Sequence, residues 1–235
     1  ETRTSGGAGV GDIFVSELDG TGTTQVHAFA PSIHSPYTEI VEFGGVFYGT
    51  CGDEAGSTFS GGIFSLTPDG MGGYTYAVEH AFTNTDNNRG PIYGITVHDG
   101  LLWYSNTNNR FVAYNPSTKT FPHSFNMAES VYKSVVINNE LHVAGGQSVY
   151  RIYSNYSGFI VQGSIPGGFI NWEDITYDGT FIYGIGFQSG TSEGAVWRMK
   201  PDGTGFENLY TNPTASELFI SKSVNFNTKV ATGVS

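Results

Sequence analysis

The side chains best suited to chemistry in this sequence are three carboxylates that recur near matching positions of an internal repeat: Glu39, Glu173 and Asp174. Aligning the repeats places Glu39 and Asp174 at one equivalent position, with Glu173 one step earlier. Two carboxylates that flank a glycosidic bond are sufficient for acid–base cleavage of a glycoside. These residues are therefore the candidates for catalysis. Residue type alone is not sufficient to assign a catalytic role to any of them.

The aligned positions also carry aromatic and basic residues, so they suit ligand binding without catalysis. An apolar surface with a few placed polar groups is typical of small-molecule and sugar sites. The residues expected to bind a ligand are Glu39, Tyr93, Tyr132, Lys133, Trp172, Asp174 and Lys222. A third interpretation is a polar channel mouth in which Lys133 and Lys222 balance nearby acids. It is favoured over catalysis because residue type without a measured separation is weak support.

Three histidines occur in a repeated His-x-Phe phrase, at His27, His80 and His123. Each is expected on the outermost strand of a different repeat, too far apart for one metal ion, whose ligand bonds are about 2 Å long. We therefore expect structural roles for these rings. The sequence has no HExxH or CxxC spacing, and Asp86-Asn87-Asn88 fits a plain polar loop better than a set of calcium ligands. We predict no metal site and no cofactor.

A separate group of aromatic and amide residues is expected in exposed loops of the second complete repeat. These residues are Trp103, Tyr104, Asn106, Asn108 and Asn109. In loops they would give a glycan an aromatic platform and amide donors. The alternative is ordinary sheet packing, since aromatic residues dominate such cores.

The elements that position these residues follow from the period of the repeat. The repeats align on one apolar position, held by Ile13, Ile63, Phe111, Val149 and Val196. Successive gaps are 50, 48, 38 and 47 residues, and the gap from Val196 through the C-terminus to Ile13 is similar. Four short strands with tight turns need about this length, which is the size of one propeller blade. The sequence predicts an all-β, five-bladed β-propeller of four-stranded antiparallel blades.

Hairpin signals give the boundaries of each unit. Gly44-Gly45, Asp99-Gly100 and Asn138-Asn139 separate runs rich in β-branched and aromatic residues, and such turns need positive φ. We predict a single domain over 1–235. Its blades are expected at about 36–82, 90–125, 130–165, 170–210, and 217–235 together with 9–29. In the split blade, C-terminal inner strands should pair with N-terminal outer strands and close the ring, which removes two exposed edges.

Composition limits the partners. The net charge is −11 and the 10 basic residues are scattered, whereas nucleic-acid binding requires clustered cations. No apolar run approaches about 18 residues, so membrane insertion is not expected. Charged residues are only 13% of the chain, which is common in exported proteins. The single cysteine, Cys51, excludes an internal disulfide and suits a small buried residue better than a reactive thiol.

The segment 36–82 contains Phe47-Tyr48-Gly49-Thr50, Pro68-Asp69-Gly70 and His80-Ala81-Phe82. With these motifs it resembles the Gloeobacter–Verrucomicrobium (GloVer) tandem-repeat family, although Cys51 replaces the second Thr of the usual pair. Residues 9–29, 90–125 and 170–205 match in part, and 130–165 and 215–235 match poorly. The resemblance implies propeller domains of bacterial extracellular or surface-anchored proteins, and it implies no catalytic residue.

These observations lead to a functional expectation. We expect a ligand-recognition or adhesion module of an exported or cell-surface protein, with a glycan as the leading ligand and a surface protein as the other partner. One alternative is a glycoside-active enzyme that uses the inner-strand carboxylates. The other is a structural module of a larger extracellular assembly.

Overall fold

The computed structural model describes residues 2–3, 11–17, 19, 21–29, 36, 38–52, 59–91, 93–166, 169–188 and 194–212. Over these residues the chain forms antiparallel β-strands and no helix. It divides into two compact units, an N-terminal unit of residues 1–130 and a C-terminal unit of residues 131–235.

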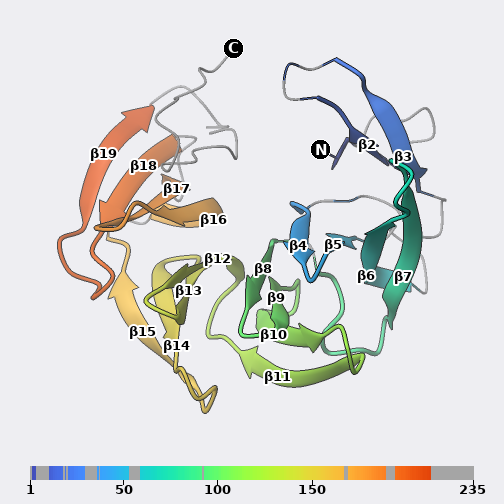
Figure 1. The fold of residues 1–235 in the computed structure, drawn as a ribbon. Helices are drawn as coiled ribbons and strands as arrows, with labels where there is room; N and C mark the ends of the chain where they lie inside the picture. The colour runs from blue at the N-terminus through green and yellow to red at the C-terminus, as the bar shows by residue number, and fades with distance from the viewer. Residues whose placement is uncertain are drawn as a thin grey trace. The chain divides into compact units, whose positions relative to one another are not determined.

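The N-terminal unit contains three sheets that follow one another along the chain (Figure 1). The first has the order β1-β2-β3, with β1 at Thr2–Arg3, β2 at Asp12–Val15 and β3 at Thr24–Ala28. The second has the order β4-β5-β6-β7, with strands at Val41–Phe43, Val46–Cys51, Phe59–Pro68 and Tyr74–Thr83. The third has the order β8-β9-β10-β11, with strands at Ile95–His98, Leu101–Ser105, Arg110–Asn115 and Thr120–Asn126.

The C-terminal unit contains two further four-stranded sheets. The fourth sheet has the order β12-β13-β14-β15, with strands at Val131–Ile137, Glu140–Gly145, Ser148–Ile152 and Phe159–Ser164. The fifth has the order β16-β17-β18-β19, with strands at Phe169–Tyr177, Ile182–Gln188, Gly194–Met199 and Glu207–Asn212. The first strands of these two sheets, β12 and β16, lie next to each other.

The innermost hairpins have the turns that the sequence predicts. Gly44 and Gly45, Asp99 and Gly100, and Asn138 and Asn139 all have positive φ, as two-residue turns of this kind require. The fifth sheet differs, because Tyr177 pairs with Ile182 across a four-residue loop. There the Asp178 carboxylate accepts hydrogen bonds from the backbone N–H groups of Thr180 and Phe181, which fixes the longer turn.

Each complete sheet fills the same place in its interior with one aromatic ring opposite a smaller residue. The cross-strand pairs are Gly49–Phe64, Tyr104–Val112, Val143–Tyr150 and Gly184–Trp197. A Cβ on Gly49 would overlap the Phe64 ring, and a Cβ on Gly184 would overlap the Trp197 ring. The two glycines are therefore required by packing and not by backbone conformation.

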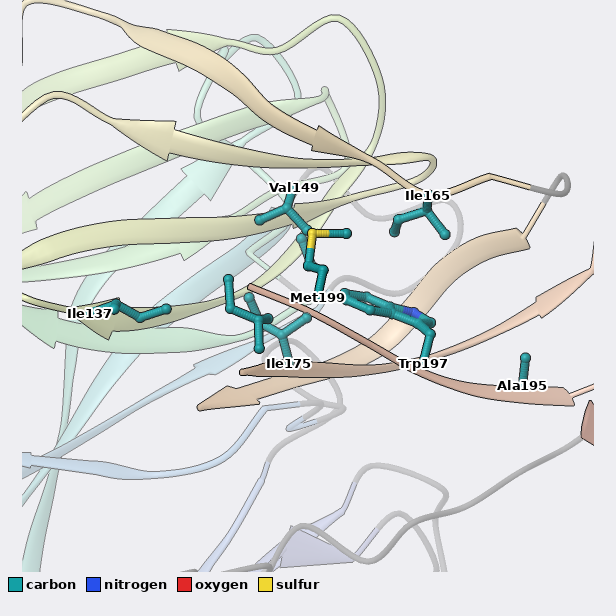
Figure 2. Packing of buried hydrophobic residues seen from close by; sticks show 9 residues of the cluster. Ile137, Val149, Ile165, Ile175, Ala195, Trp197 and Met199 are labelled. Atoms are coloured by element: carbon teal, nitrogen blue, oxygen red, sulfur yellow. The ribbon is translucent and has the colours of Figure 1, made fainter. Parts of the chain in front are cut away.

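The core of the C-terminal unit lies between its two sheets (Figure 2). Figure 2 shows the Met199 side chain extending toward Val149, with Trp197 beside it and Ile175 close by. Val149 comes from the fourth sheet and the other three residues come from the fifth. Burial of these large apolar side chains holds the two sheets together.

The chain has the all-β fold of a five-bladed propeller, as the repeat predicts. Four of the five antiparallel sheets have four strands, and the outer strands β2 and β3 of the split blade form where they were expected. The inner strands predicted within 217–235 lie outside the described residues. Beside β2 the structure instead contains β1, in which Thr2 pairs with Ile13 and Arg3 with Asp12. The sequence did not predict this short strand, and closure of one domain by the C-terminal strands stays a prediction.

Candidate functional site

The innermost strand of the second sheet departs from regular pairing where Glu39 lies. Val41 pairs with Tyr48 and Pro36 pairs with Cys51, so the inner segment holds two residues more than the β5 segment opposite it. Extra residues in one strand form a bulge, which bends the strand and changes where its side chains point.

The two sheets of the C-terminal unit have the same irregularity. In β12, Val131 pairs with Gly145 and Ser134 with Val143, which leaves one extra residue at Tyr132 and Lys133. In β16, Asn171 pairs with Gly186 and Ile175 with Gly184, which leaves two extra residues at 172–174.

The third sheet repeats the pattern through a loop. Ile95 pairs with Tyr104, and the Thr107 N–H donates to the Gly90 carbonyl at 3.1 Å. The inner segment between these two contacts again has two residues more than the segment opposite. We call the described residues of these four segments, 38–40, 91 with 93–94, 132–133 and 172–174, the inner bulges. Lys222 lies outside the described residues, and the other predicted site residues lie in the inner bulges.

A threonine pair supports the bulge of the second sheet. Thr38 is buried, and its hydroxyl accepts a hydrogen bond from the Thr50 N–H at 3.3 Å and lies 2.9 Å from the Thr50 hydroxyl. The Thr38 hydroxyl also lies 3.1 Å from the Glu39 carbonyl, to which it donates. Because of the bulge, the Thr50 N–H has no backbone carbonyl opposite it among the described residues of the inner segment, and the Thr38 hydroxyl accepts its hydrogen bond instead.

The structure brings together two of the predicted site residues, Lys133 and Asp174. The Lys133 ammonium lies 3.2 Å from Asp174 Oδ2, and the pair joins the inner bulges of β12 and β16. The Lys133 side chain is 10% exposed and the Asp174 side chain is 29% exposed. Lys133 is therefore neutralised by a neighbouring acid, as the balanced-charge interpretation predicts, and Asp174 keeps a face open to solvent.

The remaining predicted residues are spread over both units. Glu39 and Tyr93 are half-buried in the N-terminal unit, and burial raises the pKa of the Tyr93 phenol. Tyr132 is buried at 6% exposure in the C-terminal unit. Trp172 and Glu173 lie in β16, with side chains outside the described part of the structure, and Lys222 is wholly outside it. The functional roles of these residues stay predictions.

The His-x-Phe histidines have packing contacts. His27 of β3 stacks on Tyr76 of β7, with 3.6 Å between ring centroids and 7° between planes. His80 of β7 meets the edge of Phe121 of β11 at 4.9 Å. These contacts join the outermost strands of consecutive sheets, and His123 stacks within its own sheet on Trp103. Burial lowers the pKa of His27 and of His80, although the Asp86 carboxylate partly offsets the effect on His80.

The prediction that Trp103, Tyr104 and Asn106 lie in exposed loops is wrong. Their exposed fractions are 0%, because β9 carries both aromatic side chains into the interior and Asn106 is covered by the following turn. The Tyr104 hydroxyl donates to the Asn88 carbonyl at 3.1 Å. Asn108 and Asn109 are half-buried. The alternative of ordinary sheet packing holds for Trp103.

Other chemistry is restricted by the same geometry. No three His, Cys, Asp or Glu residues of the described segments cluster as metal ligands would. The Asp86 carboxylate instead accepts from the Thr83 N–H at 2.7 Å and from the Thr83 hydroxyl at 3.0 Å. Cys51 is 1% exposed, and burial raises the pKa of its thiol to about 12, so it is not reactive near neutral pH. None of the described segments is a helix able to span a membrane.

No family model matches the chain, and no curated protein sequence matches it. Among solved structures, a protein from Lactobacillus plantarum is 15% identical with a TM-score of 0.59, and the alignment covers 86% of this chain and 62% of that one. A europium-containing methanol dehydrogenase is 12% identical with a TM-score of 0.50, and the alignment covers 73% of this chain and 41% of that one. The chain thus spans less than two thirds of either neighbour. At these identities the likeness shows the propeller fold alone.

The sequence did not predict two sets of residues near the bulges. The Thr38–Thr50 pair was not singled out, although the Gly-Thr motif of the repeat contains Thr50. Asn87 and Asn88 were predicted to lie in a plain polar loop, whereas the Asn87 carbonyl accepts hydrogen bonds from the side chains of Asn106 and Asn108. The concentration of asparagine between residues 84 and 109 was the available signal.

Proposed function

We propose that this chain is a ligand-recognition module of an exported or cell-surface protein, and that its leading ligand class is glycans. The inner bulges are the observation that supports this proposal. They recur in four consecutive sheets at one equivalent place, yet they carry different side chains there, among them Glu39, Tyr93, Lys133 and Asp174. A backbone bulge that recurs in each sheet but carries different side chains favours recognition. A purely structural role would favour similar side chains at each position.

The ion pair in the C-terminal unit favours binding over hydrolysis. A glycosidase needs two carboxylates that act as proton donor and as base or nucleophile. Asp174 is instead held at 3.2 Å from the Lys133 ammonium, which orients its carboxylate and satisfies part of its charge. A carboxylate fixed in this way can accept hydrogen bonds from ligand hydroxyl groups with little loss of side-chain entropy.

The test measures binding of soluble oligosaccharides, first by glycan array and then by calorimetry. Lys133→Met and Asp174→Asn each remove one charge of the pair, and each should weaken the best array ligand by about tenfold, as expected for hydrogen bonds to charged groups. Glu207→Gln is the matched control, because it breaks the Arg198–Glu207 pair of the outer strands β18 and β19. It should leave binding unchanged.

Two results would contradict the proposal. One is a wild-type protein that retains no glycan from the array. The other is release of reducing sugar by the wild-type protein that disappears in Glu39→Gln or Asp174→Asn, which would establish a glycoside-active enzyme.

A further inference from the structure

Three loops at one end of the third sheet form a surface rich in amide side chains. They are residues 84–91, which lead toward β8, residues 106–110 around the β9–β10 turn, and residues 126–130 at the end of β11. Because the strands are antiparallel, all three loops meet at the same end of the sheet. We call them the amide surface. It contains seven asparagines, at Asn84, Asn87, Asn88, Asn106, Asn108, Asn109 and Asn126.

Backbone hydrogen bonds hold these loops to one another. The Thr107 N–H donates to the Gly90 carbonyl at 3.1 Å, and the Met127 N–H donates to the Asn109 carbonyl at 2.8 Å. Gly90 is also tied to the second sheet through its N–H, which donates to the Ser60 carbonyl at 2.8 Å. Gly90 has a φ of 69°, and a Cβ there would overlap Thr107, so the loops are in close contact. The three segments form one continuous backbone surface.

A buried asparagine fixes the backbone of two of these loops. Asn106 is 0% exposed; its Oδ1 accepts from the Asn108 N–H at 3.0 Å and from the Arg110 N–H at 2.9 Å, and its Nδ2 donates to the Asn87 carbonyl at 3.1 Å. In addition, the Ser124 hydroxyl donates to Asn88 Oδ1 at 2.9 Å. The backbone of the loops is therefore held in place before any ligand arrives, which reduces the entropy cost of binding.

Some polar groups of the amide surface remain open. Asn87 and Thr107 are exposed, and neither the Asn87 amide nor the Thr107 hydroxyl bonds to any residue in the described part of the chain. A primary amide offers two donors and an acceptor, and a hydroxyl can donate and accept. A sugar hydroxyl group also donates and accepts hydrogen bonds, so the Asn87 amide and the Thr107 hydroxyl can each donate to it or accept from it.

The charge of the amide surface points to a neutral ligand. It contains two acids, Asp86 and Glu129, and two bases, Arg89 and Arg110, so its net charge is zero, whereas the whole chain carries −11. The Arg110 guanidinium already donates to the Ser124 hydroxyl at 2.9 Å, and the Arg89 guanidinium donates to the Asp86 carbonyl at 3.3 Å. No cluster of cations is present here for a phosphate, sulfate or sugar acid.

We infer that the amide surface is a binding site for a neutral glycan, contacted directly by Asn87 and Thr107. The inference rests on the proposed glycan-binding function and deepens it. It assigns a binding site to the N-terminal unit, and it specifies neutral sugars and not acidic ones as the ligands. Beyond composition, the inference is supported by the buried Asn106, whose side chain holds the backbone of the loops that carry Asn87 and Thr107.

The test uses the full chain and a panel of soluble neutral oligosaccharides built from glucose, galactose, mannose and N-acetylglucosamine. Asn87→Ala and Thr107→Ala should each weaken binding by about three- to tenfold, the effect of one lost neutral hydrogen bond. The matched controls are Asn208→Ala on β19 and Thr75→Ala on β7, both exposed on outermost strands. They should bind as the wild-type protein does, and the affinity should not change over a tenfold range of salt concentration.

The outcomes separate this inference from the function on which it rests. Binding that is weakened by Asp174→Asn but not by Asn87→Ala or Thr107→Ala overturns the amide surface and leaves the glycan-binding function standing. If affinity falls steeply as the salt concentration rises and an acidic oligosaccharide competes for the site, the inference that the ligand is a neutral glycan is wrong. A wild-type protein that binds no member of the panel or of the array overturns both. Thermal unfolding of each variant confirms that the fold is retained.

Discussion

At the scale of single residues, the interior of each sheet depends on size complementarity between two strands. The sequence shows Gly49, Gly184, Phe64 and Trp197, but it does not show which glycine lies opposite which ring. That information depends on register, which is fixed only when the strands pair. Gly49 and Gly184 occur in the Tyr-Gly pattern of the repeat, and the structure explains them as space for an aromatic partner.

Gly184→Ala should destabilise the protein because its new methyl group would overlap the Trp197 ring. Overpacking of this kind costs about 1–3 kcal/mol in the free energy of unfolding. Urea unfolding of the full chain measures the loss.

The control for Gly184→Ala makes the residue opposite position 184 small. The third sheet has a similar arrangement, with the large Tyr104 on β9 opposite the smaller Val112 on β10. In a Trp197→Val background the added methyl group has room, so Gly184→Ala should cost clearly less there than in the wild-type protein. An equal cost in both backgrounds would mean that the methyl group and the ring do not interact.

At the scale of strands, the inner bulges account for the arrangement of the candidate site. The repeat alignment placed Asp174 at one inner-strand position and Lys133 at the position one step earlier in its own repeat, and the structure places their charged groups 3.2 Å apart. The bulges themselves could not be predicted, because an extra residue is defined by the strand opposite it and not by local sequence. The sequence therefore predicts which inner-strand positions carry the candidate site residues. It does not predict the bulges that take those residues out of the regular strand pairing.

Thr38→Val should destabilise the second sheet. The substitution keeps the shape of the buried side chain but removes the hydroxyl that accepts from the Thr50 N–H. A buried donor left without a partner costs about 1–3 kcal/mol in the free energy of unfolding. Thr38→Ser keeps the hydroxyl and should cost much less, with both changes measured by chemical unfolding. A Ser variant as unstable as the Val variant would show that the methyl group, and not the hydrogen bond, supports the bulge.

At the scale of the whole molecule, the sequence predicts the fold well because its local signals agree with one another. Positive-φ turn residues such as Gly44-Gly45 and Asn138-Asn139, strand runs between them and the period of the repeat all indicate the same sheets. The site is harder to predict, since burial decides which polar residues can reach a ligand. Asn106 and Asn87 belong to the same class of residue, yet the structure buries one in a network and exposes the other.

The stability of the folded chain should depend on pH through histidines that are buried or half-buried. The pKa values of His27, His80, His98 and His142 all lie below the ordinary value of 6.5, with burial as the largest cause. The folded state therefore binds fewer protons than the unfolded state once the pH falls below about that value. By linkage, stability rises with pH wherever the unfolded state binds more protons. The free energy of unfolding should thus fall as the pH is lowered from about 7 toward 5.

The His27–Tyr76 and His80–Phe121 contacts allow that dependence to be assigned. Phenylalanine keeps an aromatic ring at each contact between sheets but cannot take up a proton. The double variant His27→Phe, His80→Phe should therefore unfold with a shallower dependence on pH than the wild-type chain, since of these four histidines only His98 and His142 would remain. Urea unfolding at a series of pH values provides the slope. If the slope is the same in both proteins, protonation of these two rings is not coupled to the packing of the outermost strands, and the structural role of the His-x-Phe motif must rest on the phenylalanines alone.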